Sequence, residues 1–134
     1  MTLRVHTHEA ISHRLCGRPV ELYPGFAAVE MEAPPETAAD GRGLVHGGFV
    51  FGLADHAAML AVDEPTVVLA AAEVKFLKPV VVGEKLRAEA LLEMRNGRRV
   101  TVRAWVRRGS DEVLTAVFRC AVPDRHVLEP KETG

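Results

Sequence analysis

The feature that most constrains this chain is an apolar run over residues 49–62, whose only ionisable members are Asp55 and His56. The run follows the triplet His46-Gly47-Gly48 and ends shortly before a proline, which stops helices. It predicts a helix from about Gly47 to Val62. Because this helix lacks a polar stripe, it must be covered on most sides. We expect one curved sheet to wrap it and a second protomer to cover the remainder.

Asp55 is the first candidate for a functional residue. An apolar surround penalises a charged carboxylate and raises its pKa unless a partner stabilises it. Such a group is a candidate catalyst, because functional sites collect perturbed acids. The structural alternative is a buried aspartate bonded to the backbone or to His56.

Size and charge indicate one globular domain covering residues 1–134. The chain has 134 residues, 48% of them hydrophobic, and a formal net charge of −1. The near-neutral balance argues against a nucleic-acid partner, since phosphate contacts need a basic surplus. The pairs Arg98-Arg99 and Arg107-Arg108 could hold a small phosphorylated ligand, although a solvated strand edge is the commoner role for each.

Cysteine content and hydropathy point to a soluble cytoplasmic protein. The two cysteines, Cys16 and Cys120, are far apart and form no disulfide framework, which fits a reducing compartment. The first residues contain no apolar signal core. No run approaches the roughly 20 apolar residues that cross a membrane.

The two ends of the chain are polar. Residues 1–17 predict an arm or short helix, and residues 123–134 a loose tail. The arm carries His6, His8 and His13. Their spacing does not place them on one helix face, and no cysteine or carboxylate cluster completes a site, so we predict no metal.

Outside the helix the pattern is that of strands. Val20 to Ala33 predicts a hairpin around Pro24-Gly25. Period-two alternation after the helix predicts an antiparallel meander with one buried face. Its four strands are expected at residues 66–79, 84–95, 98–108 and 112–122. The fold class is therefore α+β.

The pattern Gly43-x-x-His46-Gly47-Gly48, followed by Ala54-Asp55, resembles the HGG-type (PaaI-like) acyl-CoA thioesterases. The similarity continues through Phe76-Leu77-Lys78-Pro79 and spans roughly residues 20–122. This resemblance implies the hot-dog fold, in which a curved antiparallel sheet of about five to six strands wraps one long helix. It implies an acyl-CoA substrate, no cofactor and a homo-oligomer.

The resemblance also implies roles for individual residues. The Gly47 amide would polarise the thioester carbonyl, while Asp55 would activate water or attack directly. His46 would be structural or orienting. Asp40 stands where the family usually has asparagine, which departs from the water-positioning pattern. The family's strand hydroxyl is also missing, since residues 69–72 are leucine and alanines.

Physical chemistry supports a site at the helix start. Helix N-termini present unpaired N–H groups and partial positive charge, and Gly47 and Gly48 let a ligand approach the backbone. The alternative is an ordinary glycine-rich loop that feeds a helix. Eight helical steps separate Gly47 from Asp55 by about 12 Å, so one protomer cannot bring both to one carbonyl. If both act together, they belong to different subunits, and a symmetric dimer contains two such sites.

Four further residues complete the candidate substrate contacts. Gly48 and His56 adjoin the two principal residues, and Lys78 and the arginine pairs could meet coenzyme A phosphates. Phe76 lies on the apolar face of its strand, where core packing is the commoner role. Leu91 and Trp105 fall on the polar face of the meander and could stack two dimers into a tetramer.

Two other functions remain open. The chain could be a hot-dog module that binds acyl-CoA without turnover, like the effector domain of the fatty-acid-synthesis repressor. That domain normally lacks the helix acid and is joined to a DNA-binding module. A hot-dog dehydratase is disfavoured, because the helix carries no second acid and the spacing from histidine to acid differs. The acyl group is not predicted.

Overall fold

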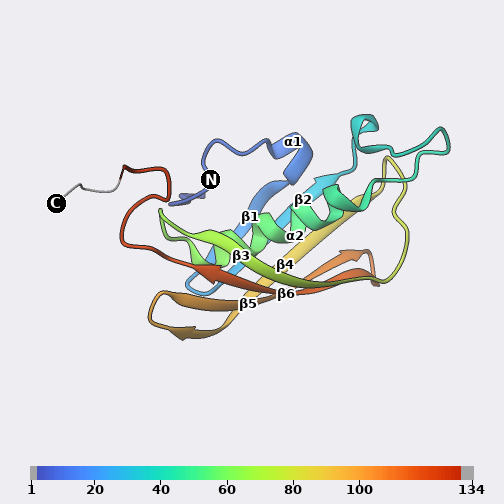
Figure 1. Cartoon of the computed structure of the whole chain (residues 1–134). Helices are drawn as coiled ribbons and strands as arrows, with labels where there is room; N and C mark the ends of the chain where they lie inside the picture. The colour runs from blue at the N-terminus through green and yellow to red at the C-terminus, as the bar shows by residue number, and fades with distance from the viewer. Residues whose placement is uncertain (1–2, 131–134) are drawn as a thin grey trace.

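The computed structural model describes residues 3–130, which form one curved six-stranded antiparallel sheet wrapped around a central helix (Figure 1). The strand order is β1-β2-β4-β5-β6-β3. The helices are α1 (His13–Cys16) and α2 (Gly47–Val62), with a 3-10 turn at Pro35–Thr37. The strands are β1 (Arg18–Tyr23), β2 (Phe26–Glu32), β3 (Val68–Phe76), β4 (Lys85–Asn96), β5 (Arg99–Arg108) and β6 (Asp111–Ala121).

The long helix α2 occupies the predicted residues and confirms the hot-dog arrangement. Ten of its sixteen residues are buried, and they face the sheet or the N-terminal arm. The left-handed residue Asp63 ends the helix, and its N–H bonds the carbonyl of Met59. The apolar surface of α2 is thus removed from water, because other elements cover most of it.

The alternation predicted after the helix is confirmed on the core face of the sheet. Inward side chains of β5 and β6 are almost fully buried, with Phe118 at the centre. On β4 the pattern breaks at its far end, because a bulge between Leu92 and Met94 shifts the register. Met94, which strict alternation from Leu86 would place on the apolar face, is therefore exposed.

The predicted order of the strands is wrong in one respect. The first strand after the helix, β3, does not pair with β4 but with β6, at the edge of the sheet. The next strand, β4, returns to pair with β2. The physical reason is that α2 crosses the face of the sheet. The chain therefore emerges from the helix at the edge opposite the β1–β2 hairpin, and β3 forms there. A pattern of alternation reports which face a strand buries but not its neighbour.

The two edges of the sheet differ. The outer edge at β1 is interrupted by Pro19 and by a bulge before Glu21, devices that block further pairing. The edge at β3 exposes four consecutive residues, Ala70 to Glu73, three of them alanines. β3 also has a bulge, between Leu69 and Ala71, but it contains no proline, and its small exposed side chains leave the edge open to a further strand.

The N-terminal arm lies against α2. His6 bonds the carboxylate of Asp63 through its amide and its ring Nδ1, each at 2.7 Å. At Gly17 the backbone has φ of 92° and passes so close to Leu53 and Val29 that an added Cβ would lie 2.5–2.6 Å from their side chains. Only glycine permits this approach, which fixes the end of the arm on the helix.

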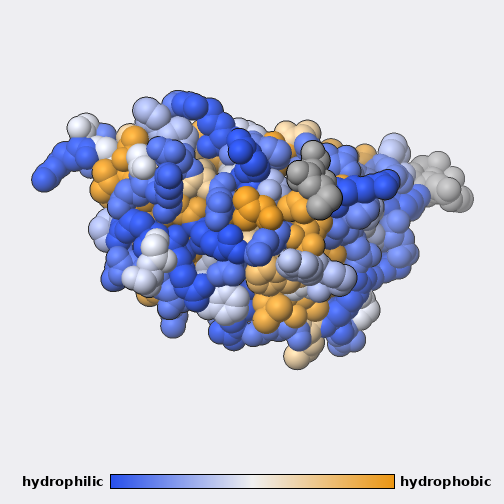
Figure 2. Space-filling view, turned by 180° about the vertical axis from the view of Figure 1, so that it is seen from behind, coloured by the Kyte–Doolittle hydropathy of each residue, from blue (hydrophilic) through white to orange (hydrophobic). Residues whose placement is uncertain are grey.

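Residues 123–130 of the predicted tail form no helix or strand, and residues 131–134 lie outside the described part. Residues 1–2 of the predicted arm also lie outside it. No helix within residues 3–130 is long and apolar enough to cross a membrane. Seen from behind, the surface is mostly hydrophilic with scattered hydrophobic patches (Figure 2).

Candidate active site

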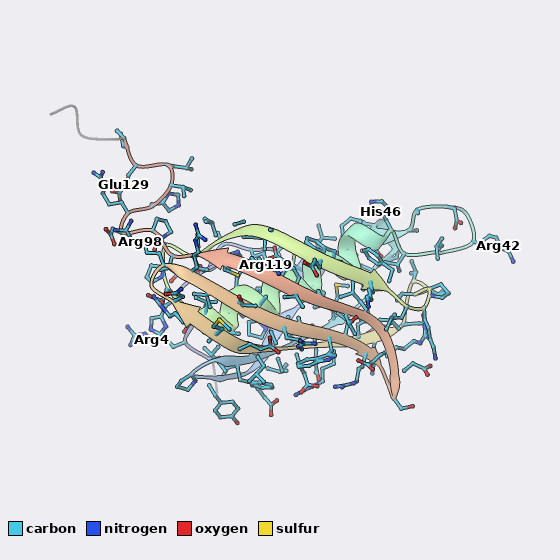
Figure 3. The ribbon with its side chains drawn as sticks, turned by 60° about the horizontal axis from the view of Figure 1, so that its bottom comes forward. Arg4, Arg42, His46, Arg98, Arg119 and Glu129 are labelled. Carbon is cyan, nitrogen blue, oxygen red and sulfur yellow. The ribbon has the colours of Figure 1, made fainter. Side chains whose placement is uncertain are left out.

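The HGG triplet forms the start of α2. His46 is the N-cap residue, but its side chain makes no capping hydrogen bond. Its amide donates to the carbonyl of Thr37 at 2.8 Å, which ties the triplet to the preceding loop. Figure 3 shows His46 at this end of the helix, with Arg42 further out on the loop. The His46 ring lies over Gly48, since an added Cβ there would sit 3.1 Å from its Cδ2.

A cavity of about 320 Å³ opens beside Gly47. Its lining is almost wholly apolar, with Lys78 the one charged residue. The residues are Val45, Gly47, Val50, Phe76, Leu77, Lys78, Pro79, Val80 and Val113. An apolar hollow that adjoins helix N–H groups suits a ligand with an apolar body and a polar carbonyl.

Phe76 forms one wall of this cavity. An added Cβ on Gly47 would lie 3.2 Å from the Phe76 ring, so the ring touches the glycine backbone. The side chain is 58% exposed. The core role expected for Phe76 is therefore wrong, because its strand is an edge strand and the ring lies at its open end. The residue is free to meet a ligand or a second protomer.

Asp55 lies two turns further along α2. Its Oδ1 is buried and has no hydrogen-bond partner within residues 3–130. Burial raises the pKa of Asp55 to about 6. One turn earlier on the same face, the Phe51 ring contacts Phe118 of β6 at a centroid distance of 5.6 Å. Asp55 therefore faces the side of the sheet where β6 and the open edge strand β3 lie.

His56 points to the other flank of α2. It is 1% exposed, and its Nδ1 lies 3.0 Å from the carbonyl oxygen of Cys16. The rings of His8 and His13 stack near it, each at 6.4 Å between centroids. Desolvation lowers the pKa of His56, and the backbone bond to Cys16 opposes that shift. Its partner is thus the arm, and the hydrogen bonds of the described residues include none between His56 and Asp55.

The remaining candidates take positions away from Asp55. Asp40 accepts hydrogen bonds from the amides of Arg42 and Leu44 and so shapes the loop before α2. Lys78 donates to Asp111 at 2.9 Å at the mouth of the cavity. Arg107 donates to Glu89 at 2.8 Å on the sheet.

A larger hollow of about 800 Å³ lies where α1 meets β1, β2 and β4. Neither Gly47 nor Asp55 lines it. Two of its arginines, Arg14 and Arg87, are already bonded to glutamates. Its paired charges and its place in the fold separate it from the candidate chemistry.

Reasoning from the sequence missed two parts of the site. One is the bare edge of β3, whose alanines alone gave no sign of edge position. The other is the contact of Arg108, which the sequence offered only as a candidate for phosphate binding, with the carbonyl of Pro79 in the cavity wall at 2.7 Å. No sequence signal pairs these two residues, because the contact depends on the crossing of the chain. Among residues 3–130, no group of three or more His, Cys, Asp or Glu is arranged to hold a metal ion.

Known proteins resemble the chain over most of its length. An uncharacterised protein from Pyrococcus horikoshii is 48% identical, and the match covers 96% of this chain and 99% of that one with a TM-score of 0.93. A variant of the phenylacetic acid degradation protein PaaI from Thermus thermophilus is 27% identical, with 81% and 95% coverage and a TM-score of 0.75. Both align with the hot-dog fold described above.

A methylthioribose-1-phosphate isomerase from Aquifex aeolicus is 43% identical over 114 residues, which are 85% of this chain. The chain spans only about a quarter of the length of that relative, since the match covers 25% of it. The profile of the thioesterase superfamily matches residues 42–115, more than half of the chain, including the HGG triplet, Asp55 and the wall of the cavity. The chain belongs to the thioesterase superfamily.

Proposed function

We propose that this protein is an acyl-CoA thioesterase of the HGG type, which hydrolyses a thioester to a free acid and coenzyme A. The observation that carries the proposal is Asp55, a half-buried acid whose buried Oδ1 has no hydrogen-bond partner within the described residues and whose pKa is raised to about 6. Burial without a partner costs stability, so a carboxylate is retained at such a position where its reactivity is used. Membership of the thioesterase superfamily supplies the class of reaction.

The proposed site is shared between two protomers. Within one chain, Asp55 and the Gly47 amide are separated by about 12 Å along the helix axis. In our proposal the bare edge of β3 pairs with the same strand of a second copy, which extends the sheet. This arrangement sets the two α2 helices side by side and brings Asp55 of one protomer toward the helix start of the other. A two-fold dimer then has two equivalent sites.

The chemistry follows from these positions. Ionised Asp55 takes a proton from water, and the hydroxide attacks the thioester carbonyl carbon. The Gly47 N–H and the helix dipole stabilise the oxyanion, an effect often worth about 3 kcal/mol. The carbon–sulfur bond then breaks, and the thiolate leaves and takes up a proton. In the nucleophilic variant, Asp55 attacks the carbonyl itself, and water hydrolyses the resulting anhydride.

The other candidate residues assist this reaction in the proposal. The apolar cavity beside Gly47 takes the acyl group, with Phe76 as a contact. Gly48 and His46 shape the helix start, and Asp40 holds the loop before it. Lys78 lies at the mouth, toward the coenzyme. His56 acts only indirectly, by holding α2 against the arm.

The proposed assembly can extend beyond the dimer. Leu91 is 45% exposed on the outer face of the sheet, and Trp105 lies on the neighbouring strand of that face. We propose that this face stacks two dimers into a tetramer.

The direct test measures thiol release from short-chain, long-chain and aryl CoA thioesters by the purified protein. We expect hydrolysis of at least one class and a kcat about 10²- to 10⁴-fold lower for Asp55→Asn, with fold and oligomeric state unchanged. Tight binding of the thioesters without cleavage would support the non-catalytic module instead. Single turnover in ¹⁸O-labelled water identifies the nucleophilic role if the product acid carries ¹⁶O from Asp55, which happens when water opens the anhydride at the aspartyl carbon; direct attack by water places ¹⁸O in the product.

A further inference from the structure

Arg108 is placed unlike the other arginines of the sheet. Its side chain is 24% exposed, the lowest value among the ion-paired arginines of residues 3–130. It lies at the end of β5, and its guanidinium turns toward the segment that follows β3. A half-buried guanidinium with several partners is held more firmly than an exposed one.

The partners of Arg108 belong to the wall of the apolar cavity. We call residues 76–80 the wall segment, because all five line the cavity beside Gly47. Arg108 Nη1 donates to the carbonyl of Pro79 at 2.7 Å and to Glu84 Oε1 at 3.2 Å. Its Nη2 donates to Asp111 Oδ2 at 3.4 Å. One side chain thus joins the middle of the wall segment to the turn after it and to the start of β6.

Two neighbouring charged residues, Lys78 and Glu84, make further hydrogen bonds around Arg108. Lys78, itself in the wall segment, donates to the other oxygen of Asp111 at 2.9 Å. Glu84 Oε1 also accepts from the amide of Val81 at 2.6 Å. Hydrogen bonds from Lys78 and Arg108 hold the pKa of Asp111 below its ordinary value. The pair of cations therefore shares one ionised carboxylate at the rim.

The wall segment has little other means of keeping its shape. It forms no helix or strand after Phe76. Backbone bonds attach it from Leu77 N to Val113 O at 2.9 Å, more weakly from Lys78 N to the same oxygen at 3.4 Å, and from Val45 N to Val80 O at 2.8 Å. Between these points Pro79 has no N–H to donate. The bond from Arg108 to the Pro79 carbonyl therefore holds the wall segment at Pro79, between Lys78 and Val80.

We propose that Arg108 is a positioning residue that sets the width of the acyl cavity and so determines which acyl groups this protein accepts. The inference rests on the proposed function, since it assigns the acyl group to that cavity. Arg108 touches no reacting atom. It acts through Pro79 and Phe76, whose ring bears on the Gly47 backbone. The substrate class that fits is an uncharged apolar acyl group, because the lining carries one charge and Asp111 engages it.

The test compares Arg108→Met and Arg108→Lys with the wild type on CoA thioesters of graded acyl length. Arg108→Met should raise KM for the preferred thioester about tenfold, with kcat changed less than twofold, and should flatten the preference for acyl length. Arg108→Lys keeps the charge but loses the forked geometry, so its KM and its acyl preference should lie between those of the wild type and Arg108→Met. Arg103→Met is the matched control, since it removes a β5 arginine that pairs with Glu93 at 2.6 Å on the outer face. It should leave the acyl preference unchanged.

The same comparison is made without turnover in an Asp55→Asn background, where calorimetry gives the Kd of each thioester. Altered binding preference in Arg108→Met with no hydrolysis by the wild type would support the positioning role and overturn the thioesterase proposal. Hydrolysis by the wild type with an unchanged acyl preference in Arg108→Met would overturn the positioning role alone. A parallel fall in kcat for every thioester, without change in preference, would also overturn it. Circular dichroism and thermal melting verify that each variant is folded.

Discussion

Asp55 and His56 are neighbours on α2, yet they lie on two flanks of this helix that differ in what covers them. The flank of His56 is covered by the N-terminal arm, and the imidazole bonds the Cys16 carbonyl at 3.0 Å. The flank of Asp55 faces the open edge at β3, and its buried Oδ1 has no partner within the described residues. Burial shifts the pKa of both groups, but within residues 3–130 only His56 has a hydrogen-bond partner for its buried polar atom.

The difference separates a structural polar residue from a functional candidate. Burial of a polar group is tolerated where a hydrogen bond compensates it, as at His56. An uncompensated acid lowers stability and is informative for that reason. The comparison predicts that changes at Asp55 affect turnover while changes at His56 affect stability.

The largest expected effect is on turnover. Asp55→Asn keeps the shape of the side chain but removes the base, so kcat should fall between about 10²- and 10⁴-fold. The measurement is the steady-state rate of thiol release with the preferred thioester. Asp63→Asn is the control, because Asp63 is a carboxylate at the far end of the same helix that bonds His6. Wild-type turnover by Asp55→Asn would contradict the assignment of a catalytic role to Asp55.

The next effect concerns the open edge. Ala71→Lys places a charge on β3, a device that natural edge strands use to prevent pairing. The variant should form an assembly with half the mass of the wild-type assembly by light scattering, and its activity should fall at least about tenfold because each site needs two subunits. Tyr23→Lys is the matched control on the opposite edge, where the side chain is already 59% exposed. An active monomer would show that the Asp55 flank needs no second chain.

Turnover should also depend on pH. Asp55 acts in its ionised form, and its pKa is about 6, so activity should be level above pH 6 and fall about tenfold per unit below it. A pH profile of kcat/KM with a nonionising thioester measures this limb. A fall of kcat/KM centred near pH 4 would mean that burial does not raise the pKa of Asp55.

Stability should change in the opposite sense at the two residues. The folded pKa of Asp55 lies above its ordinary value of 3.8, so the folded state binds the proton more tightly than the unfolded chain. The wild type therefore loses stability relative to Asp55→Asn as pH rises from about 4 to 6, by up to about 3 kcal/mol. Urea unfolding at pH 4 and pH 7 measures the difference. A stability gain that is equal at both pH values would exclude ionisation as its cause.

The smallest effect on activity is expected at His56. His56→Ala should lower the free energy of unfolding by about 2–4 kcal/mol, because it opens a cavity and leaves the Cys16 carbonyl unpaired. His56→Gln, which retains a donor, should recover part of that loss. Turnover per folded molecule should stay within about twofold for both variants. A large loss of kcat with unchanged stability would assign His56 to the chemistry.

Local patterns predicted much of this molecule. The helix bounds, the hairpin around Pro24-Gly25 and the buried faces of β5 and β6 all follow from spacing and turn residues. The position of β3 at the edge does not, because strand neighbours are set by the path of α2 across the sheet. For the same reason Phe76 was expected in the core, and the contact from Arg108 to Pro79 was not foreseen. The unusual environment of Asp55 could be predicted because a lone acid in an apolar helix is a local signal, and its catalytic role stays a prediction.

The central claim, that Asp55 of one protomer acts with the Gly47 amide of the other, is tested most directly by subunit complementation. Asp55→Asn and Gly47→Val are each inactivated as homodimers, the second because a side chain at Gly47 meets Phe76 and obstructs the helix start. The two proteins are unfolded, mixed and refolded together. If the site is shared, a mixed dimer contains one intact site and one doubly altered site, so random mixing should restore about a quarter of wild-type activity. If Asp55 and Gly47 of the same chain form the site, no mixed dimer has an intact one, and the absence of recovery in verified mixed dimers would contradict the account.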